Sequence, residues 1–101
     1  MTVSEIRNII GERVRAFEPT AEVLLFGSQA RGDARTDSDW DVMVLLDDDT
    51  KTERFDVSDK VIRIGWDLDK EINPVVYKKS EWQRKSFTPF YKNVMHDKIE
   101  L

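Results

Sequence analysis

The sequence contains no cysteine and only one histidine, His96. Without thiols the chain can form neither a disulfide bond nor a thiolate metal site. A single imidazole with no second histidine is typical of a surface residue. Any metal ion would therefore depend on oxygen ligands, and this favours a hard cation such as Mg²⁺.

Long apolar runs are also absent. Residues 1–17 alternate charged with apolar side chains, and no stretch approaches the length of a membrane span. We therefore expect a cytoplasmic protein that makes no membrane contact. The 101 residues suit one small domain over 1–101 and leave no space for a second hydrophobic core.

Basic charge is scarce in the middle of the chain, and the net charge is −4. Residues 33–77 contain thirteen acidic and six basic side chains, whereas residues 78–101 contain three acidic and six basic ones. A nucleic-acid-binding face would need clustered basic residues. General binding of DNA or RNA is therefore not expected.

Hydrophobic spacing predicts a chain of alternating helices and strands. Apolar residues three and four positions apart predict a helix that begins near Ser4 and is closed by Pro19. Short apolar runs between turn residues predict strands, and a helical turn is expected after the first. The predicted strands are 22–26, 42–46 and 73–77, with the turn at 28–31 and a second helix at 53–68.

Two prolines and two capping patterns refine this outline. Pro74 cannot donate to a strand ladder, so the third strand must lie at an edge or be bonded on one side only at that point. The box Ser80-Glu81-Trp82-Gln83 and the pair Thr88-Pro89 predict two short helices near the end. The last three residues are expected to be extended.

The stretch GSQARGDARTDSDWD, residues 27–41, carries the chemistry. Asp39 and Asp41 are two positions apart on a strand, so both side chains face one way while Trp40 faces a helix and is buried. Two neighbouring carboxylates repel each other unless a cation compensates them. We therefore predict that Asp39 and Asp41 bind Mg²⁺.

Mg²⁺ usually keeps substrate phosphates as ligands, so a phosphate site is expected nearby. Gly27 permits close approach of the backbone, Ser28 adds a hydroxyl at the start of a helical turn, and Arg31 could pair with phosphate oxygens. A triphosphate held between these residues and the two aspartates would expose its α-phosphorus to a hydroxyl nucleophile. The predicted reaction is nucleotidyl transfer.

The complete pattern is Gly27-Ser28, ten intervening residues and Asp39-x-Asp41, together with Ala30-Arg31-Gly32 and Ser38. It resembles the signature of the minimal nucleotidyltransferases of the DNA polymerase beta superfamily, and the likeness extends from the first helix to the third strand. The resemblance implies an α/β (α+β) nucleotidyltransferase fold, with a short mixed β-sheet packed by helices on one face. It also implies two Mg²⁺ ions as cofactors, with ATP or another nucleoside triphosphate as substrate. The implied partner is a HEPN-domain toxin, which forms a hetero-oligomer with this chain and receives AMP from it.

This family usually has a third carboxylate on the strand after the second helix. The matching stretch here is Glu71-Ile72-Asn73, in which Glu71 and Asn73 share a strand face. We name Glu71 as catalytic beside Asp39 and Asp41. If Asn73 faces the pair instead, the site has an amide that cannot accept the proton of the attacking hydroxyl.

Three functions follow from these alternatives. The first is an Mg²⁺-dependent transferase, and the second is a catalytically weak nucleotide-binding module that neutralises a HEPN partner by direct binding. Transfer to a small molecule would need an additional substrate-binding domain.

An apolar stripe in the tail is expected to belong to the core, and a partner could cover part of it. Basic residues beside the stripe could meet an acidic surface of the partner. The stripe is Phe87, Phe90, Tyr91, Val94 and Met95, and the basic residues are Lys78, Lys79, Arg84 and Lys85.

Two further groups of charged residues have simpler interpretations. Arg35 is expected to form a flexible ion pair with Asp37, with a nucleotide contact as the alternative. Asp47-Asp48-Asp49 resembles a metal cluster only superficially, because consecutive residues do not converge on one point. We interpret it as a solvated turn.

Overall fold

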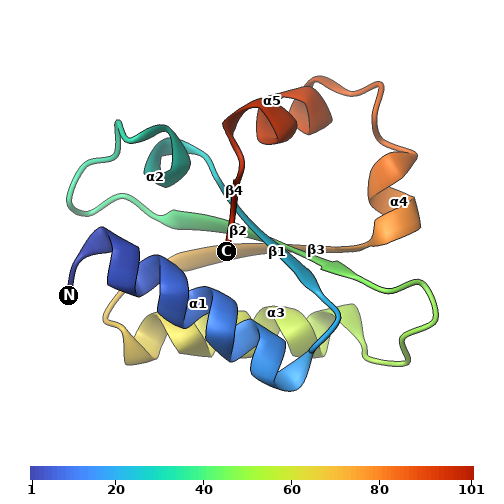
Figure 1. The fold of residues 1–101 in the computed structure, drawn as a ribbon, viewed down its shortest axis with the longest axis horizontal. Coiled ribbons are helices and arrows are strands. Elements are labelled where there is room, and N and C mark those ends of the chain that lie inside the picture. Colours follow the sequence, from blue (N-terminus) through green and yellow to red (C-terminus); the bar gives the residue numbers. More distant parts are fainter.

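A computed structural model describes residues 1–101 and places a four-stranded mixed sheet between two groups of helices (Figure 1). The strand order is β3-β2-β1-β4; β1 is antiparallel to β2 and β4, and β3 is parallel to β2. The expected class, a small α/β domain with a short mixed sheet and packed helices, is confirmed. The elements are α1 (Val3–Phe17), β1 (Glu22–Phe26), α2 (Ser28–Arg31), β2 (Trp40–Leu46), α3 (Arg54–Asp67), β3 (Ile72–Lys78), α4 (Lys79–Gln83), α5 (Pro89–Asp97) and β4 (Ile99–Glu100).

The helices α1 and α3 cover one face of the sheet, as the sequence predicts, and bury the larger part of the core. Alternate residues of β1 and β2 point into this layer. Trp40 belongs to it and is only 3% exposed, which confirms its predicted burial. The members from the helices are Ile6, Ile10, Val14, Val57, Val61 and Ile64, and those from the two central strands are Val23, Leu25, Trp40, Val42, Val44 and Leu46.

The prediction of helices on one face is incomplete, because α4 and α5 pack against the other face (Figure 1). There Trp82 and Val94 bury themselves against Leu24, Met43 and Leu45. The physical reason lies in β1 and β2, which are apolar on both faces and must be covered on both. The tail stripe is correspondingly divided: Val94 is buried, Tyr91 and Met95 are partly buried, and Phe87 and Phe90 are 78% and 41% exposed.

The strand β3 lies at the edge of the sheet, with β2 as its only neighbour. This confirms the inference from Pro74, which pairs with Val42. The strand is bonded on one side only, so the missing N–H of proline costs the ladder little. The edge position also leaves Asn73, on the same strand, exposed.

The helix α1 begins at Val3, one residue before the predicted Ser4. Thr2, not Ser4, caps this helix: the Glu5 N–H donates to the Thr2 hydroxyl at 3.1 Å, and the Thr2 N–H donates to the Glu5 carboxylate at 3.2 Å. Ser4 lies inside the helix. The capping box Thr2-x-x-Glu5 was present in the sequence and is the stronger signal, because both partners are of the favoured types.

The start of α4 also differs, whereas α5 begins as predicted. Glu81 accepts a hydrogen bond from the Lys78 N–H at 3.0 Å, so the cap is Lys78, two residues before the predicted Ser80. The Ser80 N–H instead donates to Asp48 at 3.0 Å. At α5 the Thr88 hydroxyl accepts from the Tyr91 N–H at 3.1 Å, with proline in the first turn.

The helices are short. The longest, α1, has 15 residues, and no helix is at once long and apolar enough to cross a membrane. The predicted single domain over 1–101 and the predicted location in the cytoplasm stay predictions.

Candidate active site

Gly27 connects β1 to α2 in a conformation that few other residues tolerate. Its φ is +72°, and its carbonyl accepts from the N–H groups of Ala30 and Arg31, both at 3.0 Å. A Cβ atom at this position would collide with the carboxylate of Asp41. The predicted helical turn is therefore present, and its first residues lie directly against one of the predicted metal ligands.

The antiparallel pairing of β1 with β2 brings the two halves of the motif together. Phe26, the last residue of β1, pairs with Asp41, so Gly27 and Ser28 follow at the level of Asp39. Both aspartates are half-buried, and no side chain caps the N-terminus of α2. The structure thus assembles Gly27, Ser28, Asp39 and Asp41 at one end of the sheet.

Asn73, not Glu71, completes this group. The parallel register pairs Asp41 with Asn73, whose amide N–H group donates to Asp39 at 3.1 Å and to Asp41 at 3.4 Å. Glu71 precedes β3, and its backbone carbonyl accepts from Trp40 at 2.8 Å. No three acidic or histidine side chains converge as a metal-binding group. The geometry therefore contradicts the expectation that Glu71 joins the aspartate pair.

The electrostatics of the pair reflect this arrangement. Burial raises the pKa of Asp41, and the charge of Asp39 adds to that rise, while the hydrogen bond from Asn73 and the charge of Arg31 oppose it. Neither aspartate forms a salt bridge. The two carboxylates thus lie side by side without a cationic partner, and the side chain that hydrogen-bonds to both is the neutral amide of Asn73.

The residues fit Mg²⁺, which commonly uses one or two protein carboxylates and completes its shell with water and phosphate oxygens. The shared hydrogen bonds to Asn73 show that Asp39 and Asp41 point toward one place. A half-turn of the Asn73 amide would present its oxygen there, because the two ends of an amide are nearly equal in size.

Arg31 is near the site but is already paired. Its guanidinium donates to Asp97 on α5 at 3.0 Å and to Asp33 at 3.2 Å. Asp97 also contacts His96 at 3.1 Å, and this contact is the largest cause of its lowered pKa. A phosphate would have to compete with these carboxylates for Arg31. His96 has a side chain that is 88% exposed, in agreement with its predicted surface position.

Sequence reasoning missed Arg7, which anchors the motif to α1. Arg7 donates to the backbone carbonyl of Gln29 at 2.9 Å, and the Gln29 amide donates to the carbonyl of Ser38 at 3.2 Å. These bonds fix α2 against the loop before Asp39. No local pattern indicates them, because they join residues that are distant in sequence.

The predicted ion pair of Arg35 with Asp37 is not formed. The backbone N–H of Arg35 instead donates to the Ser38 hydroxyl at 2.8 Å.

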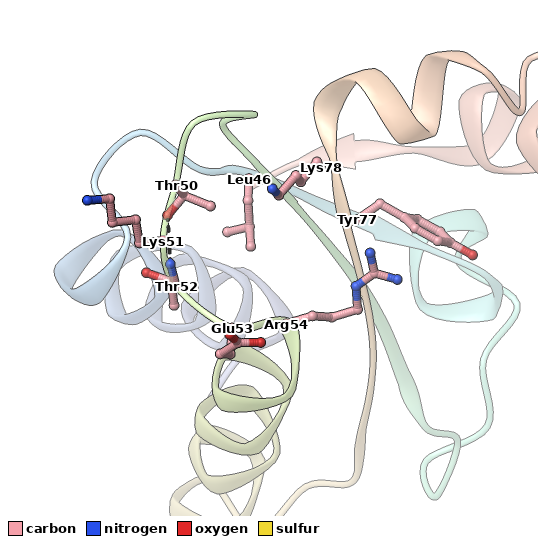
Figure 2. A pocket seen from close by; sticks show the side chains of 8 residues that line it. All are labelled: Leu46, Thr50, Lys51, Thr52, Glu53, Arg54, Tyr77 and Lys78. Atoms are coloured by element: carbon pink, nitrogen blue, oxygen red, sulfur yellow. Dashed lines mark hydrogen bonds between the residues drawn. The ribbon is translucent and has the colours of Figure 1, made fainter.

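The largest cavity lies at the opposite end of β2, with a volume of about 490 Å³ (Figure 2). It is lined by the 50–54 segment and by Leu46, Tyr77 and Lys78, and Figure 2 shows Arg54 extended toward the ring of Tyr77. None of the five cavities includes Gly27, Ser28, Asp39 or Asp41. The aspartate site therefore lies at the end of the sheet, outside these cavities, where a substrate or partner would have to enclose it.

Comparisons with known proteins agree with this geometry. The family model of the nucleotidyltransferase domain matches residues 3–100. A crystal structure of a toxin-antitoxin with AMP-PNP aligns with a TM-score of 0.66 and 24% identity, over 93% of this chain and 70% of that one. A proposed nucleotidyltransferase from Sulfolobus solfataricus aligns with a TM-score of 0.61 and 25% identity, over 97% and 80%. No curated protein sequence matches the chain.

Proposed function

The chain belongs to the nucleotidyltransferase domain family, and on this premise we propose that it transfers a nucleoside monophosphate, AMP from ATP, to a hydroxyl group of a protein partner. The observation that carries the proposal is the convergence of Asp39 and Asp41 beside the Gly27-Ser28 turn. Carboxylates and an uncapped helical turn at one point suit a magnesium-bound triphosphate.

Each part of the site has a distinct role in this proposal. The backbone of Gly27 and the hydroxyl of Ser28 bind the terminal phosphates, and Asp39 and Asp41 bind Mg²⁺. When bound, Mg²⁺ supplies positive charge that stabilises the transferred phosphoryl group and the departing pyrophosphate. Arg31 contacts phosphate after exchanging its bond to Asp97.

The transfer forms one bond and breaks one. The acceptor oxygen bonds to the α-phosphorus, and the bond from that phosphorus to the bridging oxygen of the β-phosphate breaks, so that pyrophosphate leaves. The acceptor proton passes to water, because the Asn73 amide has no basic site. We expect slow transfer for this reason, since a positioned general base contributes about a hundredfold or more.

We further propose that the partner is a HEPN-domain toxin and that the two chains form a hetero-oligomer. A toxin-antitoxin with AMP-PNP shares the fold, and this supports the proposal by analogy. The open aspartate site and the exposed Phe87 and Phe90 also suit a protein that meets a partner.

The test combines the purified chain, its partner, ATP labelled on the α-phosphate, and Mg²⁺. The candidate partner is a small all-helical protein, to be sought in the adjacent reading frame. We expect labelled partner with the wild type, and none with Asp39→Ala plus Asp41→Ala or after chelation of Mg²⁺. Equal labelling by the double variant would refute the assignment of the site.

The second candidate function is neutralisation of the partner by binding alone. It is favoured by one observation: Asn73 hydrogen-bonds to both aspartates in the place of a third carboxylate. In that case Asp39→Ala plus Asp41→Ala would still protect cells from the toxin. Phe87→Ser plus Phe90→Ser would abolish protection, because it removes exposed apolar contacts. Measuring cell survival with both double variants separates the two functions.

A further inference from the structure

A cavity of about 300 Å³ lies behind the start of β2, on the side of the strand opposite the two aspartates. Val3 and Ile6 from α1 and the buried Trp40 form part of its apolar wall. Gln29, Arg35 and Lys70 supply polar groups from three different segments. We call it the Trp40 cavity.

The charges around this cavity are of one sign. Arg35 and Lys70 are the only charged side chains that line it, and no acidic side chain does. Neither cation forms a salt bridge within the chain. This is unusual in a protein of net charge −4 whose residues 33–77 hold thirteen acids and six bases. The two neighbours of Lys70 in the chain, Asp69 and Glu71, border a separate cavity that shares Lys70.

The cavity is also close to the aspartate site in the chain. Trp40 is the residue between Asp39 and Asp41, so its Cα atom is about 3.8 Å from each of theirs. Gln29, which lines the cavity, is bonded to Arg7 and to Ser38 and thereby holds the loop that leads into β2.

From this combination we propose that the Trp40 cavity docks a segment of the protein partner in which apolar side chains alternate with carboxylates. The apolar wall takes the apolar side chains, and Arg35 and Lys70 pair with the carboxylates. The inference rests on the protein partner of the proposed function. A nucleic-acid acceptor fits less well, because Trp40 is only 3% exposed and offers no free face for a base to stack on.

The test is direct binding, measured without nucleotide. The probe is a short fluorescein-labelled peptide in which glutamate and leucine alternate around one tyrosine, and binding is followed by fluorescence anisotropy. A second peptide with lysine in place of glutamate tests the sign of the charge. We expect the glutamate peptide to bind, with an affinity that falls as salt rises, and the lysine peptide not to bind.

Charge reversal locates the binding. Arg35→Glu plus Lys70→Glu is expected to weaken binding of the glutamate peptide about tenfold. The matched control is Lys60→Glu plus Arg63→Glu, which makes the same change in net charge in the groove between α1 and α3. That groove contains Phe17, at the far end of α1 from Val3 and about 20 Å away at the helical rise. The control should bind the peptide like the wild type.

The outcomes separate this inference from the function it rests on. Absence of peptide binding, or equal weakening by both double variants, overturns the docking site. A labelled single-stranded RNA that binds in place of the peptide, with the same sensitivity to Arg35 and Lys70, also overturns it. If the peptide binds as expected but the protein partner receives no label from ATP and Mg²⁺, the docking site stands and the proposed transfer fails.

Discussion

The acidic residues at the two ends of β2 have opposite surroundings. Beyond its last residue, Asp47 binds Lys79 at 2.6 Å and Asp48 accepts from the Ser80 N–H, and these hydrogen bonds lower the pKa of both carboxyls. At its start, Asp39 and Asp41 share one amide, and burial raises the pKa of Asp41. Paired carboxylates stabilise a fold, whereas carboxylates held together without a cation mark a binding site.

Asp48 and Asp49 lie in an exposed turn, as the sequence predicts, and the segment in addition bonds to α4. Asp47 and Asp48 join the end of β2 to α4, and Glu81 of α4 binds Arg54 at 2.8 Å. Lys79, which the sequence suggested could meet an acidic partner, is therefore already paired with Asp47 of the same chain.

The largest effect is expected from Gly27→Ala, because a Cβ atom would collide with Asp41 at a positive φ. Displacement of the carboxylate should lower the rate of nucleotidyl transfer about a hundredfold. Gly32→Ala is the control, since Gly32 also has a positive φ but no atom within 4 Å of the added Cβ. Equal activity of the two variants would show that contact with Asp41 is unimportant.

Asn73→Asp is expected to raise the transfer rate, up to the roughly hundredfold that a positioned general base contributes, because it places a carboxylate that can accept the acceptor proton beside Asp39 and Asp41. Glu71→Gln should leave the rate unchanged, since Glu71 does not join the pair. Initial rates of label transfer measure both. A loss of activity in Glu71→Gln would restore Glu71 as the catalytic carboxylate.

Stability should respond in opposite directions at the two ends. Because the pKa of Asp41 is raised in the folded state, ionisation of Asp41 destabilises the fold. This loss of stability is fully present at a pH above the pKa of the folded state and absent at a pH below the pKa of the unfolded state. Asp47 has a lowered pKa, so its contribution is present above the ordinary aspartate value and is lost as pH falls through the folded pKa. At neutral pH Asp41→Asn should raise the Tm and Asp47→Asn should lower it.

Thermal unfolding at neutral and acidic pH tests this pair. Both differences from the wild type should shrink on acidification, because protonation makes each aspartic acid resemble the asparagine that replaces it. A lower Tm for Asp41→Asn at neutral pH would contradict the view that Asp41 is held at a cost to stability.

The smallest effect is expected from Asp97→Asn, which weakens the bond that holds Arg31. A freer Arg31 should strengthen binding of ATP with Mg²⁺ about threefold, as expected for one exposed charged contact. Asp59→Asn on α3 also removes one carboxylate from an arginine, Arg63, and serves as control. Isothermal titration measures the affinities, and weaker binding by Asp97→Asn would exclude a phosphate contact of Arg31.

Local features of the fold could be predicted from the sequence. β1 has the predicted bounds, and the turn at Ser28–Arg31 is present because Gly27 permits the positive φ that launches it. Pro74 indicated the edge strand. These features depend on neighbouring residues, and so the sequence pattern contains enough information to locate them.

Features that depend on distant contacts could not be predicted. Alternation places Glu71 and Asn73 on one face, but only the register of β2 with β3 decides which of them meets Asp41. The bond from Arg7 to Gln29 joins residues 22 positions apart, and no periodicity indicates it. The covering of the second sheet face by α4 and α5 likewise follows from packing of the whole chain.

The central claim is that the carboxylates at the start of β2 bind a magnesium-bound nucleoside triphosphate and those at its end do not. Isothermal titration of ATP with Mg²⁺ into Asp39→Asn plus Asp41→Asn, with Asp47→Asn plus Asp48→Asn as control, tests it directly. We predict that the control binds like the wild type and that the Asp39 and Asp41 variant shows no measurable binding. Wild-type affinity in the Asp39 and Asp41 variant would contradict the claim.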